Sequence, residues 1–244
     1  MPPEPPPQTD PIVDLADVRF AWDGGGPAVV DIGSLRVARG ERLFLRGPSG
    51  SGKSSLLSLL AGVVVAQAGS VRVLGQDLAA LGAAGRDRFR ADHVGFIFQM
   101  FNLIPYLTVI ENVMLPCGFS ERRSANAREA GGSVHGEAVR LLRHLDMADP
   151  LVLRKPVTAL SVGQQQRVAA ARALIGAPEL IVADEPTSSL DADRRQAFIE
   201  LLFQECAGES ATLVFVSHDA SLEGLFDRTV EFAQLNRALE GVAA

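Results

Sequence analysis

The sequence predicts an α/β fold, in which a sheet of parallel strands is flanked by helices. Strand-like and helix-like runs alternate along the chain, which is the pattern of strands joined by crossover helices. A glycine-rich stretch, Gly47–Ser54, stands between an apolar run at 43–45 and a helix-like run at 55–61. Two later apolar runs end in charged or polar residues, as strands do at the ligand-binding edge of such a sheet.

Gly47–Ser54 has the form G-x-x-x-x-G-K-S and predicts a phosphate-binding loop. Its glycines let successive backbone N–H groups point at one anion, and the start of the next helix adds a favourable dipole. We expect Lys53 to reach the β- and γ-phosphates of a nucleoside triphosphate and Ser54 to ligate Mg²⁺. A plain glycine–serine connection is the alternative, and the complete motif disfavours it. The expected nucleotide contacts here are Gly47, Pro48, Ser49, Gly50, Ser51, Gly52, Lys53, Ser54 and Ser55.

The composition is typical of a globular protein that binds no nucleic acid. Of the 244 residues, 47% are apolar and 21% charged, and the net charge of −6 comes with no basic stripe. No apolar run approaches the roughly 20 residues that span a bilayer. The proline-rich residues 1–11 lack the features of a secretory signal, and we expect a disordered tail. Cys117 and Cys206 have no metal-ligand spacing, which favours free thiols in a reducing cytoplasm.

The sequence on either side of the loop favours β-structure, and residues 100–175 favour helices. Thr108 and Glu111 form a capping-box pattern at the start of one helix. The polar tract 120–136 is expected to be an exposed loop or frayed helix, with its arginines in water. These arginines are Arg122, Arg123 and Arg128. Other expected elements are β-structure over 12–46, strands at 69–75 and 94–98, and helices at 79–91, 137–147 and 192–206.

Several polar groups follow predicted strands, so we expect them to meet at one edge of the sheet. A buried strand ends in Asp184 and Glu185, two carboxylates suited to a phosphate-bound Mg²⁺ and a water-activating base. Gln99 and His218 each follow another apolar run. Together these groups can converge on one phosphate tail.

Two more features point to a nucleotide. Ser161 can cap the helix that runs to about residue 174, which leaves free backbone N–H groups at a second anion-binding helix terminus. Trp22 is the only tryptophan, about 25 residues before the loop. Its ring is either an ordinary surface aromatic or a flat apolar face that stacks on adenine.

With these motifs in this order, the sequence closely resembles the nucleotide-binding subunit of ATP-binding cassette (ABC) transporters. The resemblance runs from about residue 12 to about residue 233, and Trp22 stands where that family has the aromatic residue that stacks on adenine. The matching motifs are Gly47–Ser54 (Walker A), Gln99 (Q-loop), Leu160–Gln164 (signature), Leu180–Glu185 (Walker B), Ser188–Asp191 (D-loop) and His218 (H-loop).

The resemblance implies a P-loop NTPase (RecA-like) core with an N-terminal antiparallel β-subdomain and an inserted α-helical subdomain. Residues 12–98 and 176–244 correspond to the core with its β-subdomain, and residues 99–175 to the helical subdomain that carries the signature. The resemblance also implies a head-to-tail dimer, in which Walker A of one copy and the signature of the other enclose each of two ATP molecules.

The family's mechanism assigns expected roles to individual residues. Glu185 would polarise the attacking water, and His218 would hold the γ-phosphate and orient that water. Asp184, Gln99 and Ser54 would hold Mg²⁺. The other nucleotide contacts that the resemblance implies are Trp22, Ser161, Gly163, Gln164 and Asp191.

The chain departs from the family pattern in two places. Val162 stands at the third signature position, where glycine is usual, and Ser55 stands where threonine is commoner. The family's phosphate contacts fall mainly on Ser161 and Gly163, and both residues are present. We therefore expect an active site, in which Val162 could affect the rate of turnover.

The segments 96–105 and 111–116 are similar to the branch of the family that serves lipoprotein release and macrolide or peptide export. This resemblance implies a separate permease with few membrane spans, and a peripheral location on the cytoplasmic face of the inner membrane. A soluble ABC ATPase, as in translation or DNA repair, is the alternative. The single cassette and the absence of a heptad run disfavour that alternative, and the intact motifs disfavour a catalytically dead cassette.

Overall fold

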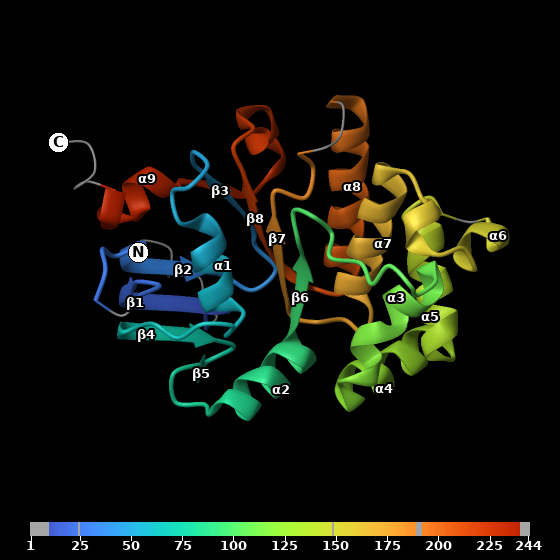
Figure 1. Cartoon of the computed structure of the whole chain (residues 1–244), viewed down its shortest axis with the longest axis horizontal. Coiled ribbons are helices and arrows are strands. Elements are labelled where there is room, and N and C mark those ends of the chain that lie inside the picture. Colours follow the sequence, from blue (N-terminus) through green and yellow to red (C-terminus); the bar gives the residue numbers. More distant parts are fainter. Residues whose placement is uncertain (1–9, 24, 148, 189–191, 240–244) are drawn as a thin grey trace, which may run out of the picture.

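The computed structural model contains two sheets, with helix α1 (Lys53–Leu60) between them and most other helices beyond the second sheet (Figure 1). It describes residues 10–23, 25–147, 149–188 and 192–239. The expected α/β architecture, with an antiparallel sheet near the N-terminus, is confirmed. The strands are β1 (Val13–Phe20), β2 (Val30–Val37), β3 (Arg42–Arg46), β4 (Ala68–Val73), β5 (Gln76–Asp77), β6 (Val94–Ile97), β7 (Leu180–Asp184), β8 (Thr212–Ser217) and β9 (Arg228–Glu231).

The first sheet is antiparallel, in the order β2-β1-β4-β5. The second has the order β6-β7-β8-β3-β9, and all its neighbouring strands are parallel. Its central strand β8 is buried along its whole length, as expected for a parallel strand covered on both faces. The carboxyl ends of parallel strands share one edge, so the residues after β3, β6, β7 and β8 come together there.

Alternation along the strands divides the apolar core into two parts. Leu43 and Leu45 point toward α1 and the antiparallel sheet, and they belong to one buried cluster with Leu56. Phe44, between them in sequence, points to the opposite face and packs in the cluster that includes Val168 of α7 (Val162–Leu174). The period of two in strand β3 therefore places a packed layer on each side of the parallel sheet.

The other helices lie mostly on the side of the parallel sheet away from α1 (Figure 1). α3 begins at the expected capping box, in which Thr108 accepts from Glu111 N–H and the Glu111 side chain accepts from Thr108 N–H. The α-helices are α2 (Ala83–His93), α3 (Val109–Met114), α4 (Glu121–Gly131), α5 (Val134–His144), α6 (Pro150–Leu153), α8 (Ala192–Gly208) and α9 (Phe232–Leu235). The 3-10 helices are η1 (Leu115–Gly118), η2 (Val157–Ala159), η3 (Ala220–Leu225) and η4 (Arg237–Leu239).

Of the two alternatives expected for residues 120–136, the exposed loop is wrong, and the segment is helical over most of its length. Ser120 caps α4 by accepting from Arg123 N–H, and Ser133 caps α5 in the same way by accepting from Gly136 N–H. Arg123 is 3% exposed, so it does not belong to a solvated face. Its guanidinium donates to the carbonyls of Ile175 and Ala173 at 2.7 Å each, which anchors α4 to the end of α7. Arg122 and Arg128 are exposed as expected.

Both cysteines are free, as expected. Cys206 is buried, and burial raises the pKa of its thiol to about 12. The expected tail over residues 1–11 falls almost entirely outside the described residues. Within the described part of the chain, no helix is long and apolar enough to cross a membrane.

Candidate active site

A pocket of about 380 Å³ lies at the carboxyl edge of the parallel sheet, beside the N-terminus of α1, since several of its lining residues end or follow the strands there. It gathers groups from six separate segments of the chain, and all of them except the segment of Val29 contain predicted site residues. Its lining residues are Trp22, Val29, Ser49, Gly50, Gly52, Lys53, Ser54, Ser55, Gln99, Asp184, Glu185 and His218. Gly47, Pro48 and Ser51 belong to the same loop without lining this pocket, and Asp191 lies outside the described residues.

The loop that precedes α1 has a conformation that only glycine accommodates at residue 52. Gly52 is the N-cap of α1 and has a φ of 100°. A Cβ atom on Gly52 would stand 2.6 Å from the carbonyl oxygen of Val29, so any side chain would collide with the backbone of the neighbouring segment. The hydroxyl of Ser51 is buried and has no hydrogen-bond partner among the described residues. Free polar groups in a closely packed glycine loop fit an anion such as a phosphate.

Lys53 lies across this loop and is 6% exposed. Its ammonium donates to the carbonyls of Gly47 at 2.7 Å and Pro48 at 2.6 Å, which leaves one of its three hydrogens for a ligand. Burial lowers the pKa of Lys53, and the charges of Glu185 and Asp184 oppose that shift. The cation therefore stands between the loop and the two carboxylates.

Asp184 ends β7, next to Ser54 at the start of α1. Burial raises the pKa of Asp184, and the charge of Glu185 adds to the increase. A hydrogen bond from Ser54 and the charge of Lys53 lower the same pKa. A hydroxyl and a carboxylate in contact, with the exposed Gln99 amide in the same pocket, supply the oxygen ligands that Mg²⁺ prefers.

Glu185 is held in an unusual backbone conformation, with a φ of 46°. Its N–H donates to Val216 O of β8 at 3.0 Å, which fixes this turn against the neighbouring strand. Its carboxylate oxygens lie 2.9 and 3.0 Å from Nδ1 of His218. Strain in a non-glycine residue is found where the surrounding structure holds a functional group in place.

Trp22 lies at the mouth of the pocket and is 61% exposed. Its ring meets Phe20 edge to face, with 5.2 Å between the ring centroids. Its indole N–H donates to the hydroxyl of Ser55 at 3.3 Å, so one contact joins the aromatic residue to the phosphate loop. An exposed indole beside the loop is placed as a base-stacking group would be.

The signature residues lie elsewhere, at the N-terminus of α7. Ser161 caps the helix by accepting from Gln164 N–H at 3.3 Å, and the Gln164 side chain accepts from Ser161 N–H at 3.0 Å. The N–H groups of Val162 and Gly163 have no hydrogen-bond partner among the described residues. None of these residues lines the pocket that contains Lys53. The two predicted anion sites, the phosphate loop and the N-terminus of α7, are therefore separate places in one chain.

A family model described as "ABC transporter" matches residues 30–188 of the chain. The lipoprotein-releasing system ATP-binding protein LolD of Anaeromyxobacter dehalogenans is 40% identical over 228 residues, 92% of each chain. The macrolide export ATP-binding/permease protein MacB of Shigella flexneri is 36% identical over 225 residues, 91% of this chain and 33% of MacB. The dimeric post-hydrolysis structure of the ATP-binding cassette MJ0796 with ADP and Pi has a TM-score of 0.78 and 32% identity, and covers 90% of this chain and 93% of that one.

The chain belongs to the ABC transporter family. It is an ATP-binding cassette of that family, and its activity is the hydrolysis of ATP. The similarity to LolD and MacB confirms the expected branch.

Sequence reasoning missed two residues of this ABC cassette: Val29, which lines the pocket, and Asn236, which contacts the loop without lining the pocket. Asn236 is 0% exposed, and its side-chain amide donates to Ser51 O at 3.1 Å and to Val29 O at 2.9 Å. Its oxygen accepts from Asp31 N–H at 2.7 Å. Nothing near Asn236 in sequence marks it as part of the site, because its partners lie about two hundred residues earlier in the chain.

Proposed function

We propose that the chain is the ATP-driven subunit of a cell-envelope transporter that exports or extracts its substrate. Two copies close head to tail around two ATP molecules, and closure and reopening drive a separate membrane permease. The observation that carries this proposal is the separation of the two anion sites within one chain. A nucleotide in the pocket of Lys53 can meet the free N–H groups of Val162 and Gly163 only if they come from another copy.

Within the proposed site, the phosphate loop and Lys53 hold the β- and γ-phosphates, and Trp22 stacks on the adenine ring. Ser55 and the loop residues Gly47, Pro48, Ser49, Gly50, Ser51 and Gly52 complete the contacts from one copy. Ser161, Gly163, Gln164 and Asp191 contribute from the second copy. The dimeric structure of the related cassette MJ0796 bound to ADP and Pi supports this arrangement.

Ser54, Asp184 and Gln99 are proposed to hold Mg²⁺, because they place oxygen ligands in one pocket with the loop. The ion supplies neutralisation of the charge that develops on the transferred phosphoryl group. No cluster of three or more His, Cys, Asp or Glu side chains suited to a metal occurs among the described residues. That fits Mg²⁺, which proteins hold with one or two carboxylates together with the substrate phosphates.

Glu185 is proposed as the base that polarises the attacking water, and His218 as the residue that orients it. The strained turn at Glu185 and the contact between the two side chains support these roles. Hydrolysis breaks the bond between the β- and γ-phosphates that links the two halves of the site, and after phosphate leaves, the dimer opens.

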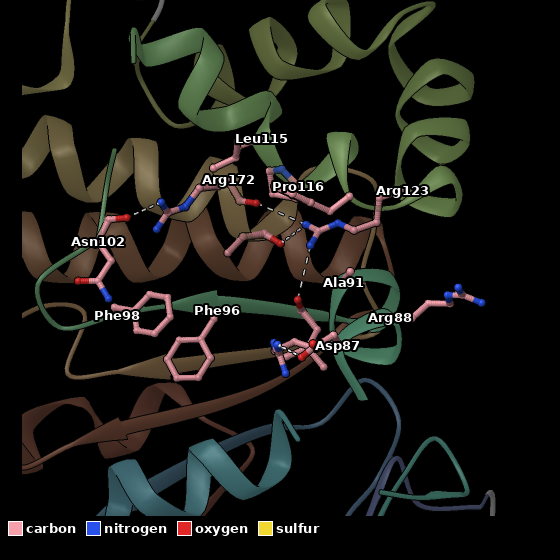
Figure 2. Close-up of a pocket in the computed structure, with 14 residues that line it drawn as sticks. Asp87, Arg88, Ala91, Phe96, Phe98, Asn102, Leu115, Pro116, Arg123 and Arg172 are labelled. Atoms are coloured by element: carbon pink, nitrogen blue, oxygen red, sulfur yellow. Dashed lines mark hydrogen bonds and ion pairs between the residues drawn. The ribbon is translucent and has the colours of Figure 1, made fainter. Parts of the chain in front are cut away.

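A larger groove of about 580 Å³ is proposed to receive the permease. Figure 2 shows Phe96 and Phe98 on one side of this groove and Leu115 and Pro116 on the other. The exposed Arg88 at its rim has no ion-pair partner among the described residues. An amphipathic permease segment with an apolar face and an acidic group would complement this surface.

One segment connects the groove to the ATP site. Phe98 and Asn102 line the groove, and Gln99 between them lines the nucleotide pocket (Figure 2). Arg172 of α7 donates to Asn102 O at 2.7 Å and to Phe101 O at 2.5 Å. Helix α7, whose N-cap is Ser161, therefore contacts the same segment. A shift of α7 at ATP binding would therefore move the wall of the groove.

We also propose that residues 12–98 and 176–244 form the nucleotide-binding body and residues 99–175 the helical lobe. The partner permease places the protein on the cytoplasmic face of the membrane in this account. LolD, by its name the ATP-binding protein of a lipoprotein-releasing system, supports a transporter role at the cell envelope.

The test is ATP binding by the Lys53→Ala variant, measured by isothermal titration calorimetry. Loss of the buried cation should weaken ATP binding by at least about 100-fold, because charge-assisted contacts to phosphate are worth roughly 1.5 to 3 kcal/mol each. The chain's other lysine, Lys155, is exposed and supplies the control Lys155→Ala. Unchanged ATP affinity in Lys53→Ala would contradict the proposal.

A further inference from the structure

We propose that Asn236 is a positioning residue that holds the phosphate loop in its nucleotide-binding form. The inference rests on the proposed ATP site and deepens it, because it explains how the loop acquires its shape. Asn236 follows α9 near the end of the described residues, and it contacts the loop at Ser51 O without lining the nucleotide pocket. It touches none of the atoms that would react.

The side chain of Asn236 uses its full hydrogen-bonding capacity. The amide nitrogen donates to Ser51 O at 3.1 Å and to Val29 O at 2.9 Å. The amide oxygen accepts from Asp31 N–H at 2.7 Å and from Ala238 N–H at 3.3 Å. An asparagine side chain has two donor hydrogens and two acceptor positions, and here all four are used in a fully buried position. The Asn236 side chain therefore joins the phosphate loop, the start of β2 and the segment that follows α9.

The contact with Ser51 O determines where Gly52 N–H points. These two groups belong to the same trans peptide, and in a planar trans peptide the C=O and N–H point in opposite directions. The Ser51 carbonyl points toward Asn236, which does not line the pocket, so Gly52 N–H points away from Asn236. Gly52 itself lines the pocket. No acceptor for this N–H is found in the part of the chain that the structure describes.

The contact with Val29 fixes the distance between the hairpin that carries Trp22 and the phosphate loop. Val29 lines the pocket, and its N–H donates to Phe20 O at 2.8 Å, which closes the hairpin that carries Trp22. Gly52 packs so closely on Val29 O that a Cβ would lie 2.6 Å away. The Asn236 amide donates both to Val29 O and to Ser51 O, the carbonyl just before Gly52. These two bonds set the position of the base-stacking hairpin relative to the phosphate loop.

The variant Asn236→Asp separates the two halves of this contact. Its carboxylate still accepts from Asp31 N–H and Ala238 N–H, and it loses both donors to Val29 O and Ser51 O. We expect the dissociation constants of ATP and of inorganic tripolyphosphate to rise by about 10-fold or more, since misaligned donors lose most of their contribution. The KM for ATP should rise more than kcat falls, because the variant leaves Glu185 and His218 in place.

Asn112 supplies a matched control in α3, away from the pocket. It is also 0% exposed, accepts from Ile104 N–H at 2.8 Å, and donates to three carbonyls. Asn112→Asp should lower the melting temperature as Asn236→Asp does and leave the dissociation constant of ATP within about 2-fold of wild type. The less disruptive pair Asn236→Ser and Asn112→Ser, which buries no charge, is measured in the same way and gives the answer where an aspartate variant does not fold.

The inference is overturned if the Asn236 variants bind ATP and tripolyphosphate as wild type does, or if the Asn112 variants lose the same affinity. These results differ from a failure of the proposed function. In that case the wild-type protein itself would bind ATP no better than Lys53→Ala.

Discussion

The imidazole of His218 contacts both carboxylate oxygens of Glu185, with Nδ1 at 2.9 Å from Oε1 and 3.0 Å from Oε2. The histidine side chain is 65% exposed and that of Glu185 only 13%. Glu185 is therefore enclosed by the end of the sheet, and the histidine covers its open side. The two groups follow neighbouring strands β7 and β8, so the parallel sheet itself brings them together.

His218→Ala should reduce the kcat of ATP hydrolysis by about 100-fold, the lower end of the range for a lost acid–base or orienting group. The dissociation constant of ATP should stay within about 3-fold, because the loop and Lys53 are untouched. Steady-state ATPase assays and calorimetry measure the two quantities. His135→Ala, at an exposed position on α5, is the control. An equal loss of affinity and rate in His218→Ala would show that the histidine supports binding instead of the chemical step.

Asp184→Asn should make the protein more stable and inactive. The folded-state pKa of Asp184 is raised, chiefly by burial, so the folded protein binds this proton more tightly than the unfolded chain does. The charged carboxylate therefore destabilises the fold at neutral pH, and this penalty disappears as the pH falls below about 3.9, the pKa of an unfolded aspartate. Removing the charge should raise the melting temperature at pH 7 by about 2 to 4 °C.

The gain in stability from Asp184→Asn should shrink as the pH is lowered toward 4, which thermal melts at several pH values can measure. Asp23→Asn, at an exposed aspartate, should show no such gain. A melting temperature of Asp184→Asn at or below that of wild type at pH 7 would mean that burial of the charged Asp184 carboxylate does not destabilise the fold.

Arg123→Leu should destabilise the fold far more than Arg122→Leu at the adjacent position. Arg123 is buried, its pKa is lowered to about 10 by that burial, and it bonds to the last carbonyls of α7. Loss of the guanidinium leaves buried carbonyls unpaired. This should lower the free energy of unfolding by about 3 kcal/mol and the melting temperature by roughly 6 to 12 °C. Arg122 is half-exposed and pairs with Glu179, so its loss should cost at most about 1 kcal/mol. Similar melting temperatures for the two variants would refute the anchoring role of Arg123.

Val162→Gly tests the departure from the usual signature. Val162 is the first residue of α7, does not have a positive φ and is 48% exposed, so its backbone needs no glycine. Since Ser161 and the N–H of Gly163 are unchanged, kcat should stay within about 3-fold and stability should fall by about 0.5 kcal/mol. An increase in kcat of about 10-fold or more in the ATPase assay would instead mean that the valine restrains turnover.

The contiguous parts of the site could be predicted from the sequence. Each consists of adjacent residues whose chemistry is visible locally, as in Gly47–Ser54 or in Asp184 and Glu185 at the end of a strand. The edge rule for parallel sheets then brought separate strand ends together, because β3, β6, β7 and β8 all end at the same edge.

The contacts made by single polar residues could not be predicted. Asn236 lies in a short stretch with no recognisable pattern, and its partners Ser51 and Val29 are distant in sequence. Arg123 has the sequence surroundings of a surface residue, since α4 is polar and packs through Ala127 and the arginine stem. Hydrophobic periodicity identifies helices that pack through large apolar faces. It does not identify a helix that is held in place by hydrogen bonds to backbone carbonyls.

The most direct test of the head-to-tail arrangement is the mass of the Glu185→Gln variant with ATP, measured by sedimentation velocity. Without the water-activating carboxylate, bound ATP should persist and hold two copies together, at twice the 25.9 kDa of one chain. Adding Ser161→Arg at the start of α7 should return the double variant to one chain, because that helix terminus must reach the nucleotide of the other copy. A single-chain mass for Glu185→Gln at saturating ATP would contradict the account.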